Sequence, residues 1–222
     1  DQLEGFNANV AHELCTPLAT LITSTEVVLR RPHAAEAHRD VLESNLEELH
    51  RLTGIVNDML FLSRADRGAT ARSERVESLA SLSNEVVDYH SAAAEELGVG
   101  FSVVGDASLE CDPGLMRRAL SNLLANATRY AEGGSDIVVN ISGTPDRIEL
   151  TVSNRGPTIP QEHQARLFDR FYRADPARAE AVQHHGLGLA IVAAIARMHG
   201  AEAFVFSEQG LTIFGLRFPV AR

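Results

Sequence analysis

The apolar residues at the start of the chain recur every three or four positions in two separate stretches, residues 6–29 and 41–62. Such spacing places apolar side chains on one stripe of an α-helix. The turn Arg31-Pro32-His33 lies between the stretches, so the pattern predicts an antiparallel helical hairpin. Two helices alone leave their apolar stripes in water. We therefore expect a homodimer through residues 1–66, in which two hairpins form an all-α four-helix bundle.

A run of small and polar residues, Asp66-Arg67-Gly68-Ala69-Thr70, interrupts this pattern and indicates a linker. We expect one domain at residues 1–66, a linker at 67–73 and a second domain at 74–222. The second domain alternates helical and strand patterns, which predicts an α+β two-layer sandwich with one helical layer. Helices are expected at residues 79–97, 113–132 and 188–199, and strands at 100–104, 137–142, 148–153 and twice more near the C-terminus.

Composition excludes several classes of function. The formal net charge of -10 argues against direct DNA binding, because phosphate neutralisation needs clustered cations. The two cysteines lack the paired spacing of a zinc or redox motif, which indicates free thiols and a reducing compartment. No apolar run approaches the roughly 18 to 20 residues of a membrane span. Because Asp1 opens the chain inside a helical pattern, we interpret it as a fragment whose upstream part could hold membrane spans.

The first predicted helix carries an imidazole followed at once by a carboxylate, His12-Glu13. Glu13 can accept the proton of the ring nitrogen that does not attack, and so hold His12 as the neutral, nucleophilic tautomer. Since later segments have spacings suited to nucleotide binding, we expect His12 to attack a phosphoryl group.

Two amides and a guanidinium gather on one face of the helix predicted at residues 113–132, which Asp112 is expected to cap. Asn122 and Asn126 lie four positions apart, and Arg129 follows on nearly the same side. Amide oxygens suit a magnesium ion that bridges phosphates, and arginine supplies fixed positive donors. Taken alone, this face is equally compatible with an ordinary polar helix surface.

Two glycine-containing segments complete the candidate nucleotide site. Asn154 begins the turn Asn-Arg-Gly-Pro-Thr-Ile-Pro, in which its amide can pair with the edge of adenine and Gly156 lets the backbone approach a flat ring. Gly186-Leu187-Gly188-Leu189 opens a helix, where free amides and the helix dipole favour an anion. Each segment alone is compatible with a simple turn or packing role. Their order along the chain favours the nucleotide interpretation.

These blocks resemble, in order, those of two-component sensor histidine kinases, and the resemblance covers the transmitter region over nearly all 222 residues. The resembling blocks are residues 12–18, 122–130, 154–160, 167–173 and 186–189. The resemblance implies a dimerisation and histidine-phosphotransfer hairpin. It also implies a following ATP-binding domain with the fold shared by gyrase, the Hsp90 chaperones, histidine kinases and MutL.

The resemblance also implies roles for individual residues. His12 would be the phosphoacceptor, Glu13 its proton acceptor, and Thr16 the residue that places water for dephosphorylating a partner regulator. Asn126 would bind Mg²⁺ with Asn122 nearby. The implied ATP-binding residues are Asn122, Asn126, Arg129, Tyr130, Asn154, Gly156, Arg173, Gly186, Leu187, Gly188 and Leu189.

The implied activity is ATP-dependent autophosphorylation of His12 and transfer of the phosphoryl group to an aspartate on a response regulator receiver domain. Phosphatase activity toward the regulator is a further expectation. The family also implies the cytoplasmic portion of a bacterial inner-membrane protein, attached to the membrane only through an upstream region.

Three positions depart from the family pattern. Cys15 stands where Arg or Lys is usual, Asn154 where many relatives have Asp, and His184 where a glycine is common. Because an amide still presents an acceptor to the adenine amino group, we expect altered rather than abolished binding. Residues 6–13, residues 41–49 and the Asn154 turn resemble the heavy-metal-sensing subgroup, for copper, zinc or cadmium. Any metal sensor would lie upstream.

Two alternatives to a kinase stay open. A non-catalytic dimeric scaffold would still bind a regulator after the three departures had disabled ATP use. An ATPase of the gyrase and chaperone type would leave the His12 helix and the hairpin unexplained. Nucleotide affinity separates the kinase from the scaffold.

Overall fold

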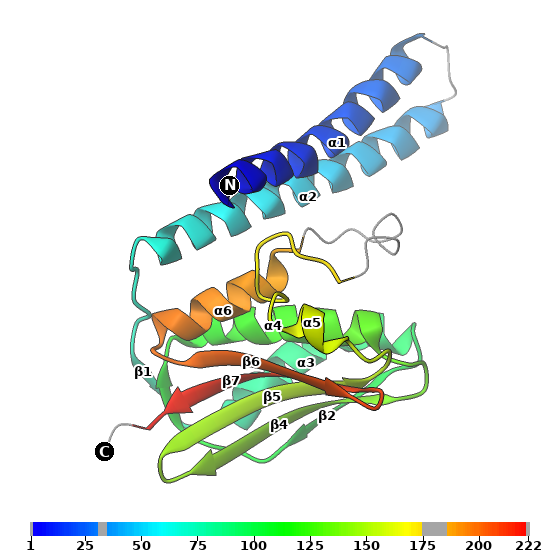
Figure 1. Ribbon diagram of the computed structural model, residues 1–222. Coiled ribbons are helices and arrows are strands. Elements are labelled where there is room, and N and C mark those ends of the chain that lie inside the picture. The colour runs from blue at the N-terminus through cyan, green and yellow to red at the C-terminus, as the bar shows by residue number, and fades with distance from the viewer. Residues whose placement is uncertain (1, 31–34, 175–185, 221–222) are drawn as a thin grey trace. The chain divides into compact units, whose positions relative to one another are not determined.

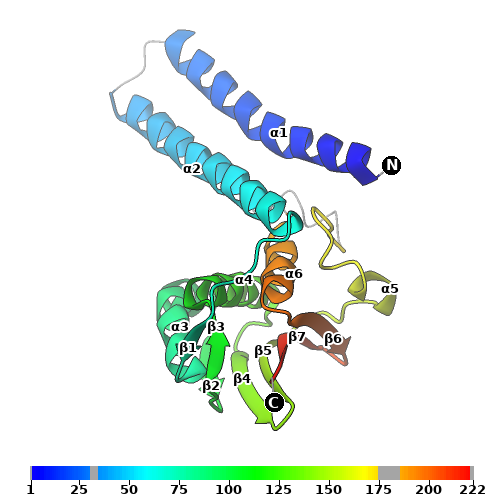
Figure 2. The ribbon, with the colours of Figure 1, turned by 90° about the vertical axis from the view of Figure 1, so that its left-hand side faces the viewer.

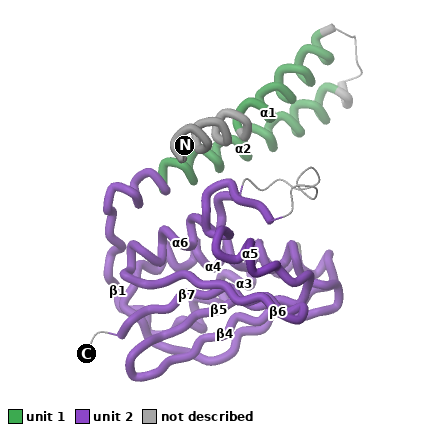
Figure 3. The backbone as a smooth tube through the Cα atoms, viewed as in Figure 1, with its two compact units in different colours: residues 1–61 green, residues 62–222 purple. Residues whose placement is uncertain are grey.

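The computed structural model describes residues 2–30, 35–174 and 186–220. The chain divides into two compact units, Asp1–Phe61 and Leu62–Arg222 (Figure 3). Within the described ranges, no helix combines the length and apolar character needed to cross a membrane.

The first unit is built from α1 (Gln2–Arg30) and most of α2 (Ala35–Asp66), which confirms the two predicted helices (Figure 1). Ser24 Oγ donates to Asn45 Oδ1 at 2.7 Å, and Asn45 Nδ2 donates to Thr25 Oγ1 at 3.1 Å, so polar side chains link the two helices. The predicted turn at residues 31–33 lies outside the described residues. Large apolar side chains on both helices are exposed, namely Leu18, Ile22, Val27, Leu29, Leu42, Leu46, Leu49, Val56 and Leu60.

The second unit contains a five-stranded mixed sheet in the order β2-β4-β5-β7-β6. Its strands are β2 (Gly100–Val104), β4 (Asp136–Thr144), β5 (Arg147–Arg155), β6 (Glu202–Glu208) and β7 (Leu211–Pro219). The β2–β4 pair is parallel and the other pairs are antiparallel. A parallel pair needs a long crossover, and here the chain between β2 and β4 supplies it with a strand and a helix.

Three helices cover one face of this sheet: α3 (Leu79–Glu95), α4 (Pro113–Tyr130) and α6 (Gly188–Met198) (Figures 1 and 2). The strands alternate buried and partly exposed residues, as expected when one face meets helices and the other meets water. The sheet contributes Ile137, Val139, Ile141, Leu150, Val152, Phe214 and Leu216 to the core. The predicted two-layer α+β sandwich is therefore confirmed.

Helix α4 has a buried face and a polar face, and its start is set by its cap. The Asp112 carboxylate accepts a hydrogen bond from Leu115 N at 3.0 Å, and Pro113 occupies the first turn. Its buried residues recur every three or four positions: Met116, Ala119, Leu120, Leu123, Leu124 and Ala127. Burial of this stripe fixes the rotation of α4 about its own axis. The side-chain amides on its polar face therefore all point toward one side of the domain.

Three short elements were not predicted from the sequence. Strands β1 (Glu74–Val76) and β3 (Leu109–Cys111) form a separate antiparallel pair, and α5 (Gln161–Gln164) is a single turn. Each has only three or four residues, which is too short for a periodic pattern to stand out.

Candidate functional site

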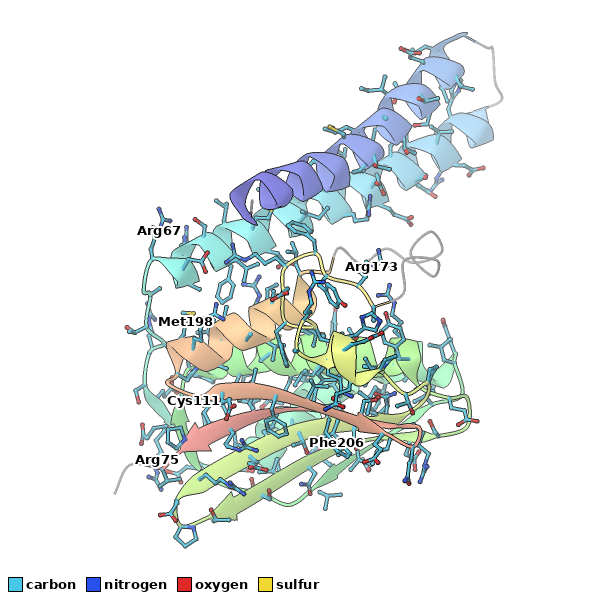
Figure 4. The ribbon with its side chains drawn as sticks, in the orientation of Figure 1. Arg67, Arg75, Cys111, Arg173, Met198 and Phe206 are labelled. Carbon is cyan, nitrogen blue, oxygen red and sulfur yellow. The ribbon has the colours of Figure 1, made fainter. Side chains whose placement is uncertain are left out.

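A pocket of about 520 Å³ opens in the second unit between α4, α5, the start of α6 and strand β7. Its described lining contains two arginines, Arg129 and Arg173, and no carboxylate. Figure 4 shows Arg173 on the segment that connects α5 and α6. The pocket wall is therefore positive although the whole chain has a formal charge of -10. Such a wall suits an anionic ligand.

Helix α4 supplies the polar side of the pocket, with Asn122, Asn126, Arg129 and Tyr130 all lining it. Asn122 Nδ2 donates to the Arg118 carbonyl at 2.8 Å, which leaves Oδ1 as the free end of the amide. A Cβ at Gly188 would lie only 2.8 Å from this Oδ1, so α6 begins directly against Asn122. The structure thus brings the α4 amides next to the glycine segment, although more than 60 residues separate them in sequence.

Arg129 carries an unsatisfied donor inside this site. Its Nη2 atom is buried and has no hydrogen-bond partner among the residues that the structure describes. The guanidinium lies 5.7 Å from the ring centroid of Tyr130. A buried charged donor without a partner is costly, and an anion in the pocket would satisfy it.

Asn154 lies at the end of β5 and is only 4% exposed. Its Nδ2 donates to the Arg155 carbonyl at 3.2 Å, so Oδ1 is left to accept from a ligand. Thr212 of β7 is in register with Asn154, lines the pocket, and shares a 2.8 Å hydrogen bond with Ser207. This corner of the pocket therefore offers amide and hydroxyl groups, with no charge.

The turn after β5 is held by backbone contacts. Gly156 N donates to the Gly210 carbonyl at 2.9 Å, and a Cβ at position 156 would collide with the Tyr130 carbonyl oxygen. Glycine is thus required for the close approach of this turn to the end of α4. Gly156 itself is not among the lining residues, whereas Pro157 to Pro160 are.

Another wall of the pocket depends on a close contact between the backbone at Phe171 and the backbone at Gly186, where the two segments cross. Phe171 N donates to the Gly186 carbonyl at 2.9 Å, and both residues have positive φ, 62° and 67°. Gly186, Gly188 and Leu189 line the pocket, whereas Leu187 is buried at 2% exposure and faces the core. The start of α6 therefore lies beside the pocket.

Several lining residues were not predicted from the sequence, among them Ser121, His163, Tyr172, Thr212 and Phe214. His163 Nδ1 and Tyr172 Oη are 2.6 Å apart, which ties α5 to the segment before Arg173. Tyr172 lies within the block of residues 167–173 that resembles the family, and this was the signal that the sequence offered for it. The others come from distant elements, so no local pattern marks them.

Ser121 also meets a histidine behind the pocket. Its Oγ lies 2.9 Å from His90 Nε2 of α3. Burial lowers the pKa of His90 below its ordinary value of 6.5, so the ring is neutral at physiological pH. The His90 ring therefore adds no positive charge to this side of the pocket.

The predicted catalytic residues His12, Glu13 and Thr16 belong to α1, in the first unit. The side chains of His12 and Glu13 lie outside the described residues, as does all of His184. Thr16 is exposed, and so is Cys15. Among the side chains that the structure describes, no group of three or more His, Cys, Asp or Glu could hold a metal ion.

Comparison with protein families identifies both parts of the chain. Residues 111–222 match the histidine kinase-, DNA gyrase B-, and HSP90-like ATPase family. Residues 2–68 match the His Kinase A (phospho-acceptor) domain. The chain belongs to the histidine kinases, and the predicted family is confirmed.

Its curated relatives include sensor proteins of several bacteria. The chain is 42% identical over 215 residues to the sensor histidine kinase CusS of Escherichia coli K12, covering 96% of this chain and 45% of that protein. It is 40% identical over 222 residues to the sensor protein CzcS of Cupriavidus metallidurans, covering 99% of this chain and 46% of that protein. The chain thus spans about half the length of these relatives.

Solved structures share the fold. The histidine kinase AdeS of Acinetobacter baumannii superposes with a TM-score of 0.79 at 20% identity, covering 95% of this chain and 98% of that one. Full-length ShkA in complex with AMPPNP gives a TM-score of 0.71 at 27% identity, covering 96% of this chain and 45% of that one.

Proposed function

We propose that the chain is the transmitter part of a sensor kinase, which uses ATP to phosphorylate His12 and passes the phosphoryl group to an aspartate of a response regulator. The observation that carries this proposal is the positive pocket with the unpaired Arg129 Nη2, on a chain that also has a phosphoacceptor domain. A purine nucleoside triphosphate carries negative charge on its phosphates, and the described pocket lining offers two arginines and no carboxylate to oppose it.

In this proposal the nucleotide spans the pocket from β5 to α6. Adenine meets Asn154 Oδ1, near Gly156 and Tyr130, and Arg129 contacts phosphate oxygens. The glycine segment, with Gly186, Leu187, Gly188 and Leu189, gives its backbone amides to the phosphates, and Arg173 faces them across the pocket. The AMPPNP bound to the related ShkA supports a nucleotide in this fold.

The residues present fit a magnesium ion. Asn122 Oδ1 is left free by the Nδ2 hydrogen bond to Arg118, and Asn126 lies one turn further along the same face of α4. Hard amide oxygens are ligands that Mg²⁺ accepts while it keeps several waters. Asn126 would hold the ion with Asn122 nearby, and the ion would neutralise phosphate charge during transfer.

The chemical step then falls to α1. The neutral imidazole of His12 attacks the γ-phosphorus of ATP, an N–P bond forms, and the bond to the leaving ADP oxygen breaks. The proton on the other ring nitrogen passes to Glu13. Thr16 lies one turn after His12 and would place water when the regulator is dephosphorylated. Positioning and charge neutralisation supply most of the catalysis.

Incubation with Mg²⁺ and radiolabelled ATP tests the proposal. We expect label on the protein that is labile to acid and stable to alkali, and no label on a His12→Gln variant. ATP binding without label would point to lost transfer, and Cys15→Arg is then the variant to examine for rescue. Absence of any ATP binding would overturn the kinase and favour the scaffold, in which the hairpin alone binds a regulator.

We also propose a homodimer through residues 1–66. The exposed apolar side chains on both helices support it, for example Leu42 at 68% and Leu46 at 54% exposure. Leu46→Asp should give a monomer in light scattering, because it places a carboxylate in the apolar interface. Leu97→Asp, at a position of 56% exposure in the other unit, is the matched control and should leave the dimer intact. A dimeric Leu46→Asp variant would contradict this interface.

The domain limits in this proposal are residues 1–66 for dimerisation and phosphotransfer, 67–73 for the linker and 74–222 for ATP binding. We further propose that this is the cytoplasmic portion of an inner-membrane sensor of heavy metals. Likeness to the sensor proteins CusS and CzcS supports that assignment, and this chain spans about half the length of each.

A further inference from the structure

The last turn of α2 and the segment that follows it contact other elements of the second unit. Leu62 is 2% exposed, and Asp66 accepts a hydrogen bond from Arg170 Nη2 at 2.5 Å. A few residues later, Ala71 N donates to the carbonyl of Met198 at the end of α6 at 3.0 Å (Figure 4). The chain that leaves α2 is therefore fastened at two separate points of the second unit.

Arg170 directly precedes Phe171, a non-glycine residue with positive φ that adjoins the pocket-lining residues Tyr172 and Arg173. Phe171 has a φ of 62°, in the left-handed region that side chains rarely adopt. Its N–H donates to the carbonyl of Gly186, and a Cβ at Gly186 would lie 2.9 Å from Phe171 Cα. Such a conformation persists only where neighbouring contacts hold it, and the Arg170–Asp66 pair is one such contact at the adjacent residue.

The residues that follow Phe171 and those that follow Gly186 line the pocket. Tyr172 and Arg173 follow Phe171, and Gly188 and Leu189 follow Gly186. A shift at Arg170 therefore moves the wall that would face the phosphates, even though Arg170 itself does not line the pocket.

We propose that the Asp66–Arg170 ion pair is a positioning contact that couples nucleotide binding to the last turn of α2. Resting on the proposed function, it gives that ATP site a regulatory input from α2, the helix that continues into the phosphoacceptor unit. Coupling of this kind is reciprocal: the pair strengthens nucleotide binding, and bound nucleotide holds the last turn of α2 more firmly.

Asp66→Asn is the decisive variant, because a positioning contact and simple electrostatics predict opposite changes in nucleotide affinity. Removal of a carboxylate from a chain of net charge -10 should strengthen the binding of an anion if only charge matters. The positioning contact instead predicts weaker binding of Mg²⁺–AMPPNP, by about two- to fivefold, which is the range for a partly exposed ion pair. Arg170→Gln should weaken binding similarly, and the double variant should lose little more.

Matched controls separate this effect from general loss of charge or stability. Glu77→Gln also removes a carboxylate, from an exposed pair with Arg75 at 2.9 Å, and Arg75 lies on β1 away from Arg173 (Figure 4). It should bind nucleotide as tightly as wild type or slightly more tightly. The reversed pair, Asp66→Arg with Arg170→Asp, should restore affinity to within about twofold of wild type. Urea midpoints should stay close to wild type throughout.

Hydrogen exchange tests the reciprocal effect in the full chain. Saturating Mg²⁺–AMPPNP should slow exchange of the Ala71 amide in wild type, and should do so much less in Arg170→Gln. Equal or tighter binding by Asp66→Asn, or an Ala71 amide indifferent to nucleotide in wild type, would overturn the coupling while leaving the kinase proposal intact. Failure of wild type to bind Mg²⁺–AMPPNP would overturn both.

Discussion

Replacement of Gly186 by alanine tests whether the crossing with Phe171 shapes the pocket. Gly186 has a φ of 67°, and an added Cβ would lie 2.9 Å from both Cα and C of Phe171. These are backbone atoms, so they cannot swing aside as a flexible side chain would. The left-handed conformation alone costs alanine about 1–2 kcal/mol. Opening the crossing also forfeits the hydrogen bond from Phe171 N, a further loss of about 1 kcal/mol.

Gly200→Ala is the matched control, because Gly200 has a φ of 65° and a Cβ added there would meet no atom within 4 Å. Gly200→Ala should lose about 1–2 kcal/mol in free energy of unfolding, and Gly186→Ala about 2–3 kcal/mol, measured by urea denaturation. Only Gly186→Ala should weaken nucleotide binding, by about five- to tenfold in calorimetric titration, since about 1.4 kcal/mol corresponds to tenfold. Wild-type affinity in Gly186→Ala would refute a role for this crossing in positioning the wall.

Three further predictions concern single groups. Arg129→Met should weaken ATP binding by about tenfold or more without lowering the urea midpoint, because it removes a buried donor that has no partner in the described part of the protein; a large loss of stability would contradict this. Burial raises the pKa of the Cys111 thiol to about 11, so iodoacetamide at about pH 8 should label exposed Cys15 and spare Cys111 in the native protein, as mass spectrometry can check. The hydrogen bond from Ala80 N lowers the pKa of Asp106 below its ordinary value of 3.8. The ionised Asp106 carboxylate therefore stabilises the folded state fully above pH 3.8. This contribution to the free energy of unfolding is lost as the pH falls through the lower pKa that Asp106 has in the folded protein. The stability difference between wild type and Asp106→Asn should shrink over the same range in urea titrations at successive pH values.

Of the three departures from the family pattern, Asn154 is the one whose surroundings give it a physical meaning. With Nδ2 held by the Arg155 carbonyl, its oxygen is the group left for a ligand, and the neutral Thr212 lies in register beside it. An acceptor is the group that the adenine amino group needs, and an uncharged one would make binding insensitive to pH in the range where an aspartate titrates. Cys15 is exposed on α1, and nothing in its surroundings explains the substitution.

The sequence by itself determined the parts of this protein that depend on near neighbours. The apolar periodicity of α4, its Asp112 cap and the spacing of Asn122 and Asn126 all lie within a few helical turns, so the helix and its polar face were predictable. The alternating strands β4 and β5 and the glycines that open α6 were predictable for the same reason.

Only the tertiary structure decided which distant residues meet. The pairing of β1 with β3, the position of Thr212 opposite Asn154 and the contact of Asp66 with Arg170 each join residues more than 30 positions apart. Strand register and backbone crossings of this kind arise from steric fit and burial across the whole domain, and they leave no periodic trace in either segment. Local spacing was therefore enough to predict the polar residues of the candidate site. The shape of the pocket walls was set by contacts that form only when the domain folds.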